Sequence, residues 1–184
     1  IAAMNIQSTE DDQMLINNIF FLKNKKCGLV LKPKFLRSFS YTRNYLKPFY
    51  KLEIEIISCL YLFTCKDILL SANNLSIHFE TYIKGCYEDD KNNQIFKSNF
   101  YEKNFVNCVF NENIISFDIY EPELCFWIIK IFVANICVAR SCFPFNVMKK
   151  GIRVLPLFDK YLNEYEDCLA IVKVEKKIYT EINK

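Results

Sequence analysis

From Lys51 onward, apolar side chains recur at every second position, and this alternation limits the possible folds more than any other feature of the chain. Leu52, Ile54 and Ile56 alternate with charged residues, a pattern typical of a half-buried β-strand. Further strands are predicted at residues 76–84, 94–99, 114–120, 125–134, 138–144, 152–157 and 168–175. About eight short strands without a convincing helix predict an antiparallel sandwich of two sheets with Greek-key connections.

The composition agrees with a dense β-rich core. Hydrophobic residues make up 52% of the 184 residues and aromatic residues 16%, which argues against disorder. The longest apolar stretch, residues 124–139, is interrupted by Lys130 and Asn135, whereas a membrane-spanning helix needs about 20 mostly apolar residues. Two buried strands joined by a tight turn fit this stretch better. The net charge of +3 is too weak to predict nucleic-acid binding, but it is compatible with mild attraction to an anionic membrane surface.

The 9 cysteines show neither regular spacing nor a Cys-x-x-Cys pair, so a zinc site is not predicted. We interpret them as reduced, mostly buried thiols of a cytosolic protein. The chain begins at Ile1 rather than at a methionine, and we expect it to be a piece of a longer protein.

The first 37 residues show a different pattern. Residues 1–7 are predicted as a strand, and Met14, Leu15 and Phe21 then recur at helical spacing. Leu29–Leu31 is a second short apolar run, which Pro33 stops. Such a piece cannot close a core, because below about 40 residues a chain usually needs a partner, a metal or disulfides. We expect residues 1–37 to be the tail of a β/α unit, residues 38–50 an aromatic and basic connector, and residues 51–184 the sandwich.

Several motifs, in a fixed order, resemble those of the eukaryotic phosphoinositide-specific phospholipases C. Residues 2–8 (Ala-Ala-Met-Asn-Ile-Gln-Ser) and 27–33 (Cys-Gly-Leu-Val-Leu-Lys-Pro) resemble the end of the Y half of that family's catalytic barrel, with Leu29 where the family has a tyrosine. Residues 117–124 (Phe-Asp-Ile-Tyr-Glu-Pro-Glu-Leu) and 143–153 resemble passages of the calcium-and-lipid-binding (C2) domain that follows the barrel. The resemblance covers nearly the whole chain.

The resemblance implies a mainly β fold: an antiparallel eight-stranded C2-type β-sandwich, preceded by the last β/α portion of an incomplete TIM barrel. The parent enzyme would hydrolyse phosphatidylinositol 4,5-bisphosphate to diacylglycerol and inositol trisphosphate in intracellular signalling. This piece would scaffold the barrel and aid membrane association. Its implied partners are a phosphoinositide-containing membrane and the rest of its own barrel, with no nucleic acid, in a cytoplasmic and peripherally membrane-associated protein. The alternative is a non-catalytic C2-like module that binds lipid or protein.

Catalytic residues are not predicted in this chain. The family's two histidines, which serve as general base and acid, precede the matched segment. The single histidine here, His78, alternates onto a polar face with Glu80 and Tyr82, so we interpret it as a surface strand residue. Asn5 and Gln7 stand near a barrel strand's end and are candidates for the barrel mouth, with structural packing as the other interpretation. Candidate lipid-surface contacts, with a plain solvated face as the alternative, are Arg43, Lys47 and Lys51.

Calcium is implied for the parent enzyme's active site, through ligands outside this chain. Many C2 domains also hold calcium with loop aspartates, because calcium requires hard oxygen ligands. Here the first loop, residues 59–74, contains only Asp67, and Ser76 stands where an aspartate is usual. The third loop is cut down to residues 134–136, and the acidic run 88–90 is predicted as a hairpin tip at the opposite end. No calcium is therefore predicted to bind this chain.

Overall fold

A computed structural model describes residues 12, 37, 48–65, 76–85, 95–102 and 104–179. The strand predicted at residues 1–7, the helix predicted after it apart from Asp12, and the connector up to residue 47 lie outside the described residues. The division into residues 1–37, 38–50 and 51–184 therefore stays a prediction.

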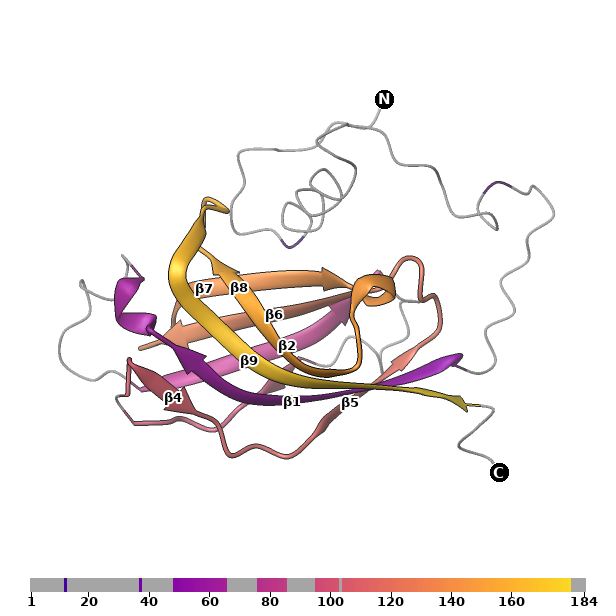
Figure 1. Cartoon of the computed structure of the whole chain (residues 1–184), viewed down its shortest axis with the longest axis horizontal. Helices are drawn as coiled ribbons and strands as arrows, with labels where there is room; N and C mark the ends of the chain where they lie inside the picture. Colours follow the sequence, from indigo (N-terminus) through magenta and orange to yellow (C-terminus); the bar gives the residue numbers. More distant parts are fainter. Residues whose placement is uncertain are drawn as a thin grey trace.

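The described chain consists of antiparallel β-strands (Figure 1). The strands and two short 3-10 helices are β1 (Tyr50–Leu60), η2 (Leu62–Thr64), β2 (Ile77–Lys84), β3 (Phe96–Lys97), β4 (Asn107–Val109), β5 (Ile115–Ile119), β6 (Phe126–Val133), β7 (Ile136–Pro144), η4 (Phe145–Val147), β8 (Gly151–Phe158) and β9 (Glu164–Ile178). Among the described helices, none is long and apolar enough to cross a membrane.

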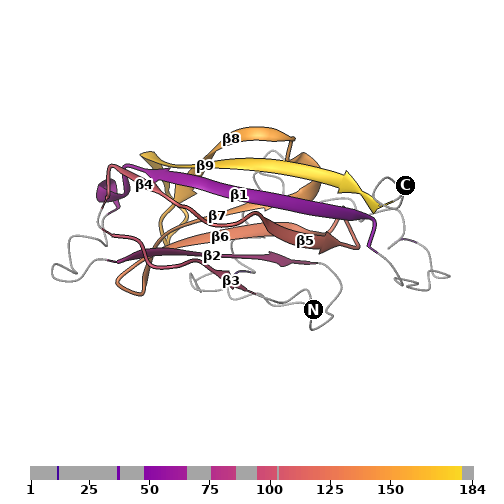
Figure 2. The same ribbon diagram turned by 90° about the horizontal axis from the view of Figure 1, so that it is seen from below.

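The strands form two layers (Figure 2). Their order is β3-β2-β6-β7-β8-β9-β1-β4, and a single residue pair, Arg140 with Phe158, joins β7 to β8. One layer is thus β3-β2-β6-β7, and the other contains β8, β9 and β1. β4 pairs with the end of β1 and β5 pairs with its beginning, so these two strands share one position beside β1. The nine strands therefore occupy eight positions, which confirms the predicted mainly β, eight-stranded fold.

The core lies between the two layers, where the alternating apolar side chains meet. Leu52, Ile54 and Ile56 of β1 are buried, as the alternation predicted. On β6 the inward residues include Trp127, whose indole N–H donates a hydrogen bond to the Thr81 hydroxyl of β2. Because each layer is hydrophobic on its inner side, neither layer is stable without the other.

The apolar stretch 124–139 folds as two strands, as predicted. β6 and β7 pair along their whole length around a two-residue turn at Ala134 and Asn135, whose φ angles are 49° and 66°. Left-handed backbone at both positions is typical of the tightest hairpin turns. β4 was not predicted, because only three residues pair there and Cys108 alone is buried.

Candidate functional site

One end of the sandwich gathers four connections and is the first candidate site. β1 and β8 run toward this end, while β2 and β7 begin there. The described residues of the connections are 61–65 and 76, 98–102 with 104–106, 134–135 and 159–163. We call this region, together with the adjoining Ile136, the loop end.

The loop end exposes large apolar side chains. Each is between 41% and 65% exposed, although such residues prefer a protein interior. They come from four different segments: Tyr61, Phe63, Phe100, Val106, Ile136 and Tyr161. Aromatic side chains with a polar tip suit a boundary between water and an apolar phase. The arrangement can therefore meet a membrane interface or an apolar protein surface.

The loop end differs from a calcium site in its described residues. Asp159 is buried, and its carboxylate accepts hydrogen bonds from the backbone N–H groups of Tyr161 at 2.8 Å and Asn163 at 2.9 Å. This aspartate therefore holds the β8–β9 turn, a role that sequence reasoning missed. Within the described residues no three His, Cys, Asp or Glu side chains are grouped to hold a metal. Asp67 and the acidic run 88–90 lie outside them.

His78 is not a surface residue, so that prediction was wrong. Its side chain is 1% exposed, stacked on Phe132 at 4.9 Å between ring centroids and edge-on to Phe100 at 4.9 Å. Both aromatic neighbours come from other segments, so alternation within β2 gave no sign of this burial. Burial, followed by the charge of Lys97, lowers the pKa of His78, and neither ring nitrogen has a hydrogen-bond partner among the described residues. A general base needs positioned partners within hydrogen-bond reach, and the described residues provide none for His78.

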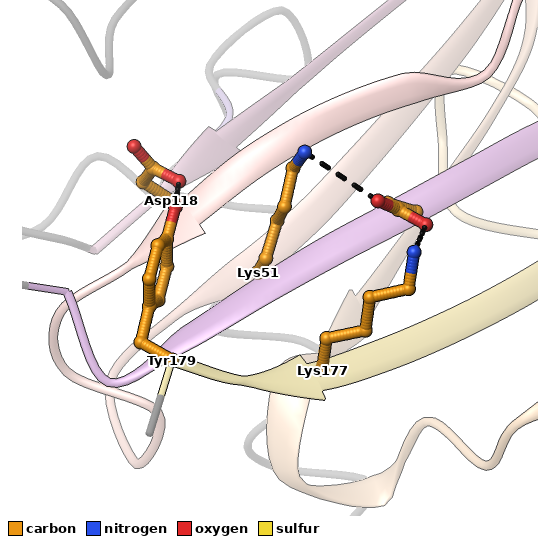
Figure 3. A network of polar contacts seen from close by, with 5 residues as sticks. Lys51, Asp118, Lys177 and Tyr179 are labelled. Carbon is orange, nitrogen blue, oxygen red and sulfur yellow. Dashed lines mark hydrogen bonds and ion pairs between the residues drawn. The ribbon is translucent and has the colours of Figure 1, made fainter. Parts of the chain in front are cut away.

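The candidate lipid contacts and barrel-mouth residues stay predictions. Asn5, Gln7, Arg43 and Lys47 lie outside the described residues. Lys51 lies near the start of β1, away from the loop end, and its ammonium is 3.5 Å from the Glu53 carboxylate. Glu53 is also 2.6 Å from the Lys177 ammonium of β9. Figure 3 shows the ammonium groups of Lys51 and Lys177 directed at one carboxylate. Lys177, followed by Lys51, lowers the pKa of Glu53, so the carboxylate compensates both cations near neutral pH.

Five of the seven described cysteines are buried thiols, as predicted. Five of the six that form no disulfide are buried, and Cys65 and Cys168 lie 3.6 Å apart between their sulfur atoms. Cys125 is in a disulfide bond whose partner lies outside the described residues, so the prediction of reduced thiols was wrong for this residue. Pairing depends on proximity in space, which irregular cysteine spacing does not reveal.

Comparisons with known proteins extend over nearly the whole chain. No protein-family model matches it. Among curated proteins, the chain is 22% identical over 184 residues to "1-phosphatidylinositol 4,5-bisphosphate phosphodiesterase gamma-2" of Homo sapiens, a match that covers 96% of this chain and 14% of the human protein. The crystal structure of L. pealei PLC21 matches with a TM-score of 0.76 and 22% identity, covering 97% of this chain and 23% of that one. The chain thus spans less than a quarter of either relative.

An isolated C2 domain matches a smaller part of the chain. The C2A domain of plant Extended Synaptotagmin 1 has a TM-score of 0.56 and 16% identity, and it covers 72% of this chain and 98% of its own. The sandwich therefore has the C2 fold, as the motifs predicted. In sequence and in fold, this chain is similar to the C-terminal region of phosphoinositide-specific phospholipase C, which includes a C2 domain.

Proposed function

We propose that this chain is the C-terminal part of a phosphoinositide phospholipase C, a hydrolase that cleaves phosphatidylinositol 4,5-bisphosphate to diacylglycerol and inositol trisphosphate. The name of the human relative gives this substrate and a phosphodiesterase activity. Within that enzyme, the chain scaffolds the catalytic barrel and supports membrane association. The acid–base residues and the calcium ligands belong to the rest of the enzyme.

One observation favours this proposal over the alternative, a C2-like module without a catalytic barrel. The isolated C2A domain covers 72% of this chain, whereas PLC21 covers 97% with the higher TM-score. The additional quarter of the chain is thus matched by a phospholipase C chain and not by a C2 domain alone. A lipid- or protein-binding module without a barrel gives no reason for that match.

A domain exchange tests the proposal. The region of the human phosphodiesterase gamma-2 that this chain matches is replaced by residues 1–184, and release of inositol trisphosphate from mixed vesicles is measured. We expect the chimera to hydrolyse the lipid, because the chain completes the barrel and attaches a C2 domain to it. A chimera that folds and binds vesicles but releases no product would favour the non-catalytic module.

The second part of the proposal places the membrane contact at the loop end. The exposed aromatic and aliphatic side chains there are the observation that favours it. Burial of a large apolar side chain contributes about 1.5–3 kcal/mol, so two or three of them give measurable binding without calcium. The candidate contacts Arg43 and Lys47 would add weaker attraction to anionic headgroups, whereas Lys51 lies away from the loop end and is paired with Glu53.

Paired serine substitutions test the loop end. Replacing Phe63 and Tyr161 by serine is expected to weaken binding to phosphatidylcholine–phosphatidylserine vesicles at least tenfold, by sedimentation without calcium. The matched control replaces Ile152 and Val154, which are equally exposed (62% and 59%) but lie on the outward face of β8. Equal losses in the two double variants would place the contact elsewhere.

A further inference from the structure

The end of the sandwich opposite the loop end gathers cationic side chains. They come from the turn after η4, the start of β8 and the end of β9, and we call them the cationic cluster: Lys149, Lys150, Arg153 and Lys176. The register of β8 with β9 pairs Gly151 with Val174, so Lys176 lies two residues beyond the start of β8, beside the turn that contains the two other lysines. Figure 1 shows this end of β9 (yellow) on the side of the sandwich away from the short purple helix η2.

Arg153 holds this turn in one conformation. Its guanidinium donates hydrogen bonds to the backbone carbonyls of Lys149 at 3.1 Å and Ile152 at 2.9 Å, and to that of Lys150. Gly151 has a φ of 98°, a conformation that residues with a side chain rarely adopt, and this lets the chain turn into β8. The backbone that carries both lysines is therefore fixed before any ligand arrives, and such preorganisation favours binding.

Lys176 brings a cation to the cluster from a second segment. Its ammonium donates a hydrogen bond to the Phe145 carbonyl and lies over the Phe145 ring, 4.1 Å from the ring centroid. Burial, followed by the charge of Lys150, lowers the pKa of Lys176. The two ammonium groups therefore lie close enough to repel each other, and an anion between them would relieve the repulsion.

The cationic cluster lacks a counter-charge of its own. Among the described residues, no carboxylate forms an ion pair with any of its four side chains. Two carboxylates of the neighbouring strands have other partners: Glu53 lies between Lys51 and Lys177. Asp118 accepts a hydrogen bond from the Tyr179 hydroxyl, as Figure 3 shows. Because a partly buried cation is normally paired, this arrangement favours an anion from outside the chain.

We propose that the cationic cluster is a binding site for a soluble anion that carries two or more phosphate groups. Lysine and arginine bind phosphate oxygens through charge-assisted hydrogen bonds, and cations from two segments can reach separate phosphate groups of one ligand. A single carboxylate would meet only part of the cluster. The cluster lies at the end away from the proposed membrane contact, so it faces away from the lipid surface. The choice of a soluble anion over a lipid headgroup rests on that part of the proposed function.

Isothermal titration calorimetry of the full chain with inositol trisphosphate tests the site, because this probe is small, soluble and carries several phosphate groups. The double variant Lys149→Gln with Lys150→Gln removes two exposed charges and retains the backbone carbonyls that Arg153 contacts, so we expect it to fold normally. Binding is expected to weaken about tenfold, the scale of one lost charge-assisted hydrogen bond. Lys176→Gln is expected to act in the same direction from the other segment.

The matched control is the double variant Lys97→Gln with Lys173→Gln. It also removes two exposed lysine charges, but from β3 and from the outward face of β9. A second arm measures sedimentation of the same variants with phosphatidylcholine vesicles that contain phosphatidylinositol 4,5-bisphosphate. This arm separates a lipid headgroup from a free phosphate-bearing anion.

The comparison of the variants decides the proposal. Saturable binding of inositol trisphosphate that both cluster variants weaken, and the control does not, supports it. No binding to the native chain, unchanged binding in either cluster variant, or an equal loss in the control overturns it. If the cluster variants lose only vesicle binding and the soluble probe does not bind, the cluster contacts lipid headgroups and the assignment to a soluble anion is wrong. None of these measurements uses hydrolysis, so their failure leaves the proposed phospholipase function standing.

Discussion

Thr81 is the residue that connects polar groups across the core. Its hydroxyl donates a hydrogen bond to the Ile128 carbonyl at 2.8 Å and accepts one from the Trp127 indole, and the residue is fully buried. Thr81→Val preserves the shape of the side chain but leaves the indole N–H without its acceptor. We expect the free energy of unfolding to fall by about 1–3 kcal/mol.

Thr81→Ser is the matched control, because it retains the hydroxyl and loses only a methyl group. Urea unfolding followed by the fluorescence of the single tryptophan measures both variants. A Thr81→Val variant as stable as Thr81→Ser would mean that the hydrogen bond contributes nothing beyond packing.

His78 makes stability depend on pH, and the direction follows from its lowered pKa. The unfolded chain takes up a proton near pH 6.5, whereas folded His78 takes it up only at lower pH. The unfolded state therefore binds more protons, and stability falls as the pH is lowered from 7.5 toward 5. One such group contributes a slope of up to about 1.4 kcal/mol per pH unit.

The substitution His78→Phe separates this slope from that of the carboxylates. Phenylalanine fits between the two neighbouring rings and cannot be protonated, so the variant is expected to lose less stability than the native chain on acidification. Chemical unfolding at pH 7.5, 6.5 and 5.5 provides the comparison. Parallel loss of stability in the two proteins would show that His78 is protonated equally in both states.

At the scale of elements, the alternation of β1 and the hairpin of β6 and β7 could be predicted from the sequence. Leu52, Ile54 and Ile56 face one layer whatever their partners are, because a strand has a period of two. The turn at residues 134–135 followed from the interruption of an apolar run. Each of these features depends only on residues close together in the sequence, so it could be predicted from the sequence pattern.

Features that depend on contacts between segments could not be predicted. The burial of His78 needs Phe100 from another connection, and Tyr82 and Ile128 are buried on a face that alternation marks as outward. The exposed side chains of the loop end come from four segments that the fold brings together. Sequence reasoning searched that end for acidic ligands and so missed its apolar character.

The short β6–β7 turn limits the number of calcium ligands at the loop end. Calcium needs six to eight oxygen ligands, and a two-residue turn brings few of them to the loop end. We expect micromolar calcium to leave the melting temperature of the chain unchanged. If calcium bound the folded chain, a free calcium concentration of 100 times the dissociation constant would add about 2.7 kcal/mol to the free energy of unfolding. A rise of several degrees in the melting temperature would therefore contradict this expectation.

At the scale of the whole molecule, the chain alone is expected to be inactive toward phosphatidylinositol 4,5-bisphosphate. Its single histidine is buried without a hydrogen-bond partner among the described residues, so an acid–base pair cannot be built on it. Release of water-soluble inositol trisphosphate from vesicles by purified residues 1–184 is the measurement. Turnover that His78→Ala abolishes would refute the prediction.

Residues 44–184 are expected to fold without the preceding segment. This piece contains every described strand, and the hydrogen bonds of Phe49 with Ile119 and Tyr179 close the sandwich near its start. Urea should therefore unfold it in one cooperative transition. In the full chain, amides 2–7 and 29–31 should exchange within seconds, because those predicted strands lack the rest of a barrel.

Residues 44–184 lack Asp12, whose carboxylate contacts Tyr82 and Lys130 in the full chain. Cys168 lies between the two layers, so it should stay protected from maleimide in residues 44–184. Strong protection of amides 2–7 in the full chain would show that this part packs stably on the sandwich, and the predicted boundary near residue 44 would be wrong. Rapid reaction of Cys168 in residues 44–184 would show instead that the two layers need the preceding segment to stay closed.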